Sequence, residues 1–109
     1  MVIDLDAIQR AHREWVDRNF PDETLSQAIH GVAEEAGELS HHFLKEEQGI
    51  RVDEDHVAGM VDAVGDLMIY LMSVCDHLRI SLSDVLVSTW TSVEKRDWAN
   101  YPEKGVPVD

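Results

Sequence analysis

The chain has 109 residues, and its nine Lys and Arg residues face twenty-two Asp and Glu residues, which gives a formal net charge of −13. This length predicts a single domain, and hydrophobic residues at 44% supply enough apolar material for a folded core. A charge this negative excludes unaided binding to nucleic acid or to an anionic membrane, because both need a basic surface. We therefore expect neither nucleic acid nor membrane among its partners.

The amino terminus and the single cysteine predict a cytoplasmic protein. Residues 1–6 lack the basic start and the apolar run of a secretory signal. The longest apolar run, Leu67–Cys75, is far shorter than the roughly 20 residues that cross a bilayer. Cys75 has no second cysteine with which to form an internal disulfide, which fits a reducing compartment.

Apolar residues spaced by threes and fours predict a first helix from about Asp4 to Asn19, because that spacing places them on one helix face. Pro21 follows and does not continue the helix. No proline, and no serine-rich or glycine-rich linker, then interrupts the chain until Pro102. We therefore expect a few long helices.

The second helix begins at a cap formed by Asp22 or Thr24 and extends to about Gln48, with Gly49 as its stop. Six apolar residues form its stripe: Leu25, Ile29, Val32, Ala36, Leu39 and Phe43. A third helix follows over about residues 55–78. Its stripe comprises Val57, Met60, Val61, Val64, Leu67, Met68, Leu71, Cys75 and Leu78.

The segment Ser81-Leu82-Ser83-Asp84 resembles a capping box and opens a fourth helix that runs to about Arg96. Four helices with short connections predict an all-α four-helix bundle, with one domain over residues 1–109. The core of this domain spans about residues 5–98. We expect the tail, residues 99–109, to be irregular.

Acidic residues recur four apart on both central helices. The second helix carries Glu34, Glu35 and Glu38, and the third carries Asp62 and Asp66. Residues three or four apart share a helix face, so these like charges repel one another unless water or a cation compensates. A solvated acidic face is the ordinary interpretation of such a pattern, and two further features argue against it.

The first feature is that Ile69 and Tyr70 follow Asp66 by about one turn toward the same side, so the aspartate face is not freely exposed. The second is that Gly37 and Gly65 each cost about 1 kcal/mol in a helix interior, and we expect them to let the two backbones approach closely. Hard oxygen ligands on two facing helices suit Mg²⁺, or alternatively Mn²⁺, better than Zn²⁺. A metal site is therefore the preferred interpretation.

A divalent cation allows an acidic chain to take an anionic substrate, because Mg²⁺ is usually held by a few carboxylates together with water and substrate phosphates. Lys45, Lys95 and Arg96 are candidate phosphate contacts. Trp15 on the first helix and Trp90 on the fourth are candidate stacking partners for a base, although core packing is the commoner role of a helical tryptophan.

Residues 31–39 read Gly-Val-Ala-Glu-Glu-Ala-Gly-Glu-Leu, and residues 62–67 read Asp-Ala-Val-Gly-Asp-Leu. These segments resemble the MazG-like group of all-α NTP pyrophosphohydrolases, which is related to dimeric dUTPases, dCTP pyrophosphatases and phosphoribosyl-ATP pyrophosphohydrolases. The family pattern is Glu-Glu-x-x-Glu on one helix and Glu-x-x-Asp on the next, and the resemblance covers about residues 5–98. The first motif is complete here, whereas Ala63 stands where the second motif has glutamate.

The resemblance implies a metal site and a reaction. It assigns Glu35, Glu38 and Asp66 as metal ligands, with Asp62 as a substitute one position before the family's glutamate. It also implies a catalytic set of Glu34, Glu35 and Glu38, in which Glu34 ligates the metal or orients an attacking water. The expected reaction is hydrolysis of an NTP or dNTP between the α- and β-phosphates to a nucleoside monophosphate and pyrophosphate, a housecleaning activity on the nucleotide pool.

Two other interpretations stay open. A ferritin-like di-metal protein would use the Glu-x-x-His of Glu38 and His41, but such sites need a second Glu-x-x-His and two further glutamates, usually on four helices. A non-catalytic acidic interaction module with a decayed site would also look similar, because Ala63 lacks a carboxylate.

The same resemblance implies an oligomer, since small units of this family assemble as dimers or tetramers. Residues 67–75 are apolar on nearly every side, and one surrounding bundle of this size does not cover them all. We expect a homodimer or a homotetramer.

Overall fold

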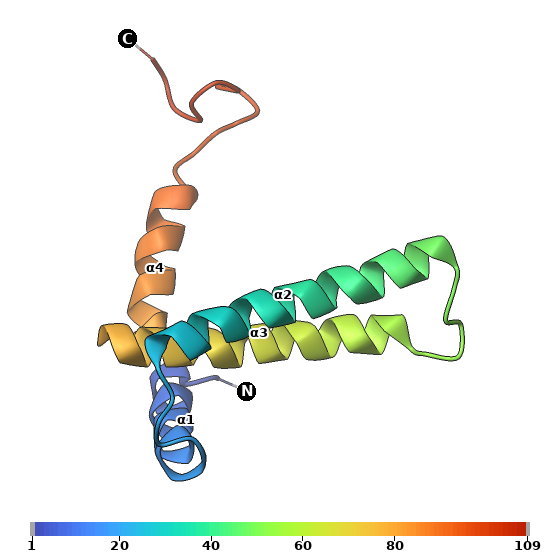
Figure 1. The fold of residues 1–109 in the computed structure, drawn as a ribbon. Coiled ribbons are helices and arrows are strands. Elements are labelled where there is room, and N and C mark those ends of the chain that lie inside the picture. The colour runs from blue at the N-terminus through green and yellow to red at the C-terminus, as the bar shows by residue number, and fades with distance from the viewer. Residues whose placement is uncertain (1, 109) are drawn as a thin grey trace.

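The computed structural model describes residues 2–108, which form four α-helices and no strand. The helices are α1 (Leu5–Asn19), α2 (Leu25–Gln48), α3 (His56–Leu78) and α4 (Leu82–Val93). The predicted all-α class and the number of helices are confirmed. Figure 1 shows α2 and α3 side by side as an antiparallel pair, with α1 and α4 extending away from one end of that pair in opposite directions.

Side chains cap each helix at its amino end and so define where it begins. Of the two candidates for the cap of α2, the structure uses Thr24, whose hydroxyl accepts from the Gln27 amide while the Gln27 side chain accepts from the Thr24 amide. This capping box satisfies two amide groups that the helix itself leaves free. At the other end of α2, Gly49 adopts a left-handed conformation with φ of 67°, and α2 stops there as expected.

The fourth helix begins where it was predicted to begin and ends earlier. Ser81 caps it, accepting from the Asp84 amide at 3.1 Å, and the Ser81 hydroxyl also donates to the Asp6 carboxylate of α1 at 2.7 Å. Among the described residues the Asp84 side chain returns no hydrogen bond to the Ser81 amide, so only half of the capping box forms. The helix ends at Val93, three residues before the predicted Arg96. Within the described part of the tail, residues 99–108, only turns and bends follow, as expected.

Small residues mediate the contact between α2 and α3. Ala28, Gly31 and Ala63 are buried there, and the ring of Tyr70 lies on Gly31 so closely that an added Cβ would stand 2.2 Å from it. The predicted role of Gly37 and Gly65 in close approach is wrong. A Cβ at either position meets nothing within 4 Å, because both glycines lie on the sides of their helices that face away from the pair.

The predicted apolar stripes of α2 and α3 remain largely uncovered. Ile29 and Phe43 on α2, and Val57, Val61 and Val64 on α3, are each 49–66% exposed. Ile29 follows Ala28 and Val64 follows Ala63 by one residue, a rotation of about 100° from the contact. Because the two helices are antiparallel, equal rotations bring both stripes to the same side of the pair. This side is called the apolar face.

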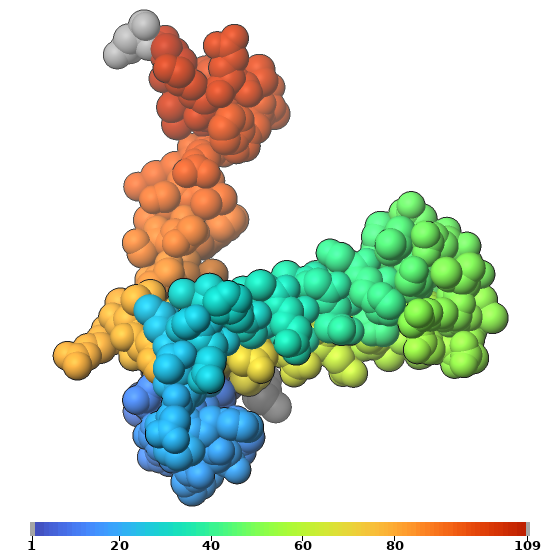
Figure 2. Space-filling model, in the orientation of Figure 1, coloured from blue at the N-terminus to red at the C-terminus, as the bar shows by residue number. Residues whose placement is uncertain are grey.

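Glu34, Glu38, Asp62 and Asp66 are rotated from the contact residues toward the side of the pair opposite the apolar face, and Glu35 lies near the contact itself. The molecule measures 53 × 42 × 33 Å, and Figure 2 shows the α2–α3 pair and α4 with its tail as two diverging arms. Hydrophobic residues are buried where helices meet near the junction and along the α2–α3 contact: Val16, Ala28, Ala63, Met72 and Cys75.

α3 has the length and the apolar composition of a membrane-crossing helix, although a core helix of a soluble protein passes the same test. Only 17% of its most apolar stretch is buried within the described chain. Asp62 and Asp66 interrupt it, and carboxylates in a lipid environment are costly. α3 is therefore an apolar helix that one copy of the chain leaves mostly uncovered.

Candidate metal centre

The five predicted carboxylates line one cavity of about 330 Å³ between α2 and α3. We call it the carboxylate cavity. Its acidic residues are Glu34, Glu35 and Glu38 from α2 and Asp62 and Asp66 from α3. The prediction that these residues face one another across two helices is confirmed in this respect.

Mutual repulsion marks the electrostatics of the carboxylate cavity. The pKa of the Glu35 carboxyl is raised above its ordinary value of 4.5, first by loss of solvent and then by the negative charges of Asp66, Glu34 and Glu38. The pKa of the Tyr70 hydroxyl is raised as well, first by loss of solvent and then mainly by Glu34 and Glu35. A concentrated negative potential of this kind attracts cations.

Within residues 2–108, no three acidic, histidine or cysteine side chains converge closely enough to form a ready-made metal cage. The donors nevertheless fit a hard divalent cation, because five carboxylates on two helices supply only oxygen atoms. Mg²⁺ does not require an all-protein cage, since it keeps several waters and takes oxygen atoms from substrate phosphates.

Ala63 and Asp62 both line the carboxylate cavity. Ala63 is only 2% exposed and sits in the contact between the two helices, so a carboxylate at position 63 would point into the cavity. Asp62 stands one position earlier and reaches the cavity from its open rim. The one-residue shift therefore leaves a carboxylate at the cavity and moves it away from the helix contact.

A second cavity of about 460 Å³ adjoins the first, because Glu35 and Asp66 line both. Aromatic side chains contribute much of its wall, and we call it the aromatic cavity. Trp15 and Phe20 meet there with ring centroids 5.6 Å apart, and Tyr70 lines it from α3. Trp15 is 45% exposed, so it lines the cavity instead of filling a core.

The predicted basic contacts are not brought to the carboxylate cavity. Lys45 lies nearly two turns beyond Glu38 and donates to Gln48 at 3.2 Å. Lys95 and Arg96 follow the end of α4, which projects away from the α2–α3 pair (Figure 1). Trp90, on α4, is 58% exposed and likewise lies outside the aromatic cavity. The sequence pattern placed Lys45 and Trp90 on helices correctly, but it wrongly extended the fourth helix to Lys95 and Arg96 and did not reveal that α4 leaves the pair.

A histidine pair beside the carboxylates was missed as a functional feature. His42 lines the carboxylate cavity, and its Nδ1 lies 3.1 Å from Nδ1 of His56 at the start of α3. His42 follows Glu38 by four residues, and helical spacing places it on the same face, but this spacing assigns it no role. Its contact with His56 forms across the 49–55 connector, and the sequence gives no periodic signal for it.

Comparison of the chain with models of known protein families, with curated proteins and with solved structures finds no match.

Proposed function

We propose that this protein is a metal-dependent nucleotide pyrophosphohydrolase of the MazG-like type, which hydrolyses an NTP or dNTP between the α- and β-phosphates. One observation carries the proposal. A cavity with five carboxylates from two facing helices adjoins an aromatic cavity, and Glu35 and Asp66 belong to both. A nucleotide has the matching division, with a charged polyphosphate at one end and a flat base at the other.

The cation is Mg²⁺, with Mn²⁺ as the alternative, and Glu35, Glu38, Asp62 and Asp66 are its protein ligands. Such an ion, when bound, neutralises charge on the phosphates and lowers the pKa of a water. The raised pKa of Glu35 supports this assignment, because a carboxylate held among like charges gains from a nearby cation.

The remaining groups orient the substrate and accept a proton. Glu34 lines the open part of the carboxylate cavity, where its carboxylate orients a water and accepts the proton that this water loses on attack. In the aromatic cavity, Trp15 stacks on the base. The Gln27 amide, which also lines that cavity, offers the base a hydrogen bond from its side chain.

The functional unit in this proposal is a homodimer or a homotetramer formed through the apolar face. Exposed aliphatic residues on the same side of α2 and α3 support it. Because Asp62 and Asp66 on α3 would be costly in lipid, a second copy of the chain is favoured over a membrane as the partner that covers the apolar face.

The test is release of pyrophosphate from a panel of dNTPs and NTPs in the presence of Mg²⁺. Wild-type protein should release pyrophosphate from at least one nucleotide, and Glu38→Gln should lower kcat/KM by about 100-fold or more, in the range typical for loss of a charge-stabilising group. Glu47→Gln is the matched control, because Glu47 is exposed on the same helix and outside the carboxylate cavity. Equal activity of the two variants would contradict the assigned site.

The pyrophosphate assay, together with a measurement of bound iron, also tests the ferritin-like interpretation. The structure places His42, not His41, beside Glu38, and the buried His56 is engaged by the connector. Stoichiometric iron in protein purified without added metal, together with no pyrophosphate release, would favour the di-metal interpretation over the present one.

A further inference from the structure

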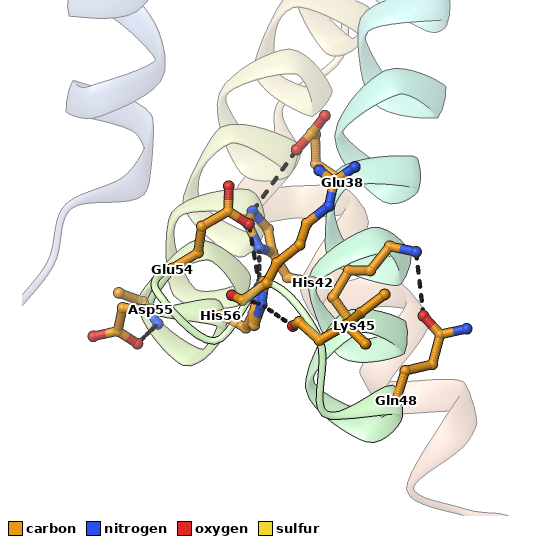
Figure 3. Close-up of polar contacts among 10 residues, drawn as sticks. Glu38, His42, Lys45, Gln48, Glu54, Asp55 and His56 are labelled. Atoms are coloured by element: carbon orange, nitrogen blue, oxygen red, sulfur yellow. Dashed lines mark hydrogen bonds and ion pairs between the residues drawn. The ribbon is translucent and has the colours of Figure 1, made fainter.

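A chain of polar contacts runs from the 49–55 connector into the carboxylate cavity. His56 is only 3% exposed, and its Nε2 lies 3.0 Å from the carbonyl oxygen of Arg51 and 3.3 Å from that of Ile50. Its Nδ1 lies 3.1 Å from Nδ1 of His42. Figure 3 shows His42 between His56 and Glu38.

These contacts fix which nitrogen atoms carry hydrogen when both rings are neutral. Carbonyl oxygens only accept, so Nε2 of His56 must donate to them, and Nδ1 of His56 is left as an acceptor. His42 must therefore donate from its own Nδ1, which leaves the lone pair of His42 on Nε2. The buried ring of His56 and two backbone carbonyls thus determine the tautomer of His42.

Nε2 of His42 lies at the carboxylate cavity. It is 3.8 Å from Oε2 of Glu38, and the ring lies against Gly59 of α3, where an added Cβ would stand 2.5 Å from Nε2. Gly59 and Ala63 line this part of the cavity and offer no side-chain donor of their own. The imidazole lies in the space that the missing side chain of Gly59 leaves.

A neutral histidine that donates one ring N–H to the protein and turns its other nitrogen toward acidic side chains has the arrangement of a metal ligand. We propose that, when the cation at the carboxylate cavity is Mn²⁺, Nε2 of His42 is one of its ligands. Imidazole suits first-row transition metals, whereas Mg²⁺ prefers oxygen ligands alone. This inference rests on the proposed function, because it adds a ligand to the same metal site.

The test uses Mn²⁺ itself as the probe, on the full chain without nucleotide. Pulsed electron paramagnetic resonance of bound Mn²⁺ should show coupling to a directly bonded ¹⁴N nucleus in wild-type protein. His42→Gln should lose this coupling and weaken Mn²⁺ binding by about tenfold or more, while Mg²⁺ binding changes much less. His30→Gln is the matched control, since His30 is exposed on the same helix and hydrogen-bonds only within its own turn.

A second variant keeps the result interpretable if His42→Gln perturbs folding. Gly59→Ala adds a Cβ 2.5 Å from Nε2 of His42, which forces the imidazole to move, and it changes none of the five carboxylates, so it should also remove the ¹⁴N coupling. Circular dichroism of each variant reports whether the helices are retained.

The outcomes separate this inference from the proposed function. Bound Mn²⁺ without ¹⁴N coupling, or coupling that persists in His42→Gln, would overturn the inference and leave the carboxylate site standing. No Mn²⁺ binding by wild-type protein would overturn both.

Discussion

At the scale of single residues, the carboxylate cavity brings like charges close together, which costs stability, at the position proposed for the metal ion. Five acidic side chains share a small volume, and each ionised neighbour makes the next ionisation harder. The helices tolerate this because small residues, Ala28, Gly31 and Ala63, hold the two backbones together. Repulsion among the acids is therefore opposed by close packing beside them, and a cation relieves it.

Glu35 provides the sharpest test of this environment, because loss of solvent and then the neighbouring negative charges raise the pKa of its carboxyl. The unfolded chain releases this proton near the ordinary pKa of 4.5, whereas the folded chain keeps it to higher pH. Folded protein therefore binds more protons in that interval, and its stability falls as the pH rises through it. Glu35→Gln removes this loss, so in EDTA the variant should melt at a higher temperature than wild-type protein near neutral pH, but not near pH 4.

A divalent cation should reverse the order of the two melting temperatures, so that wild-type protein melts above Glu35→Gln. Wild-type protein gains stability from Mg²⁺ by mass action, about 2.7 kcal/mol at a concentration 100 times the dissociation constant, and Glu35→Gln should gain much less. Differential scanning calorimetry in EDTA and in Mg²⁺ measures both effects. A wild-type protein that melts at the same temperature with and without cation would contradict this prediction.

Two glycines of α2 give opposite predictions for the same substitution. Gly31→Ala places a Cβ against the Tyr70 ring, so it should destabilise the fold by about 1–3 kcal/mol, as overpacking does. Gly37→Ala meets nothing within 4 Å and should stabilise the fold by about 0.5–1 kcal/mol through helix propensity. Urea unfolding followed by circular dichroism measures both, and equal shifts would show that the Gly31–Tyr70 contact does not matter.

At the scale of helices, the sequence predicted the bounds of each helix better than it predicted how the helices pack against one another. Caps, stops and helical spacing predicted α1, α2 and α3 to within about a residue, because these signals lie inside each segment. The acidic residues were correctly placed on facing helices for the same reason. Gly37 and Gly65 were misinterpreted because propensity reports the cost of a glycine and not which helix face it occupies.

Long-range features were beyond the sequence pattern. The direction of α4 depends on the turn at residues 79–81 and on the Ser81–Asp6 hydrogen bond, which joins residues 75 positions apart. The His42–His56 contact depends on the path of the connector. Lys95 and Arg96 are separated from the carboxylates because α4 points away from the α2–α3 pair, and no periodicity in the sequence predicts that direction.

The apolar face leads to a prediction at this scale. Val64 is 53% exposed within one chain, so Val64→Asp should leave the helices folded but add a charge to the surface between copies, where an unpaired charge is costly. Light scattering after size-exclusion chromatography should give a dimer or tetramer mass for wild-type protein and a lower mass for the variant. Ala58→Asp adds the same charge to an exposed position of α3 outside the apolar face and should not change the mass. A wild-type monomer would contradict the prediction.

At the scale of the whole molecule, the acidic balance and the uncovered apolar face have a common explanation. A chain with net charge −13 repels free nucleotides, yet it concentrates five acids where one divalent cation reverses the local sign. In the proposed function, one side of the α2–α3 pair binds the cation and the other side contacts a second copy. The aromatic cavity adjoins the cation side, where a nucleotide base would reach it.

Identification of the phosphorus products tests this account most directly. Wild-type protein incubated with Mg²⁺ or Mn²⁺ and each dNTP and NTP in turn is followed by ³¹P nuclear magnetic resonance, which separates pyrophosphate from orthophosphate. We predict a nucleoside monophosphate and pyrophosphate in equal amounts from at least one nucleotide. A nucleoside diphosphate with orthophosphate, or no turnover of any nucleotide with either cation, would contradict it.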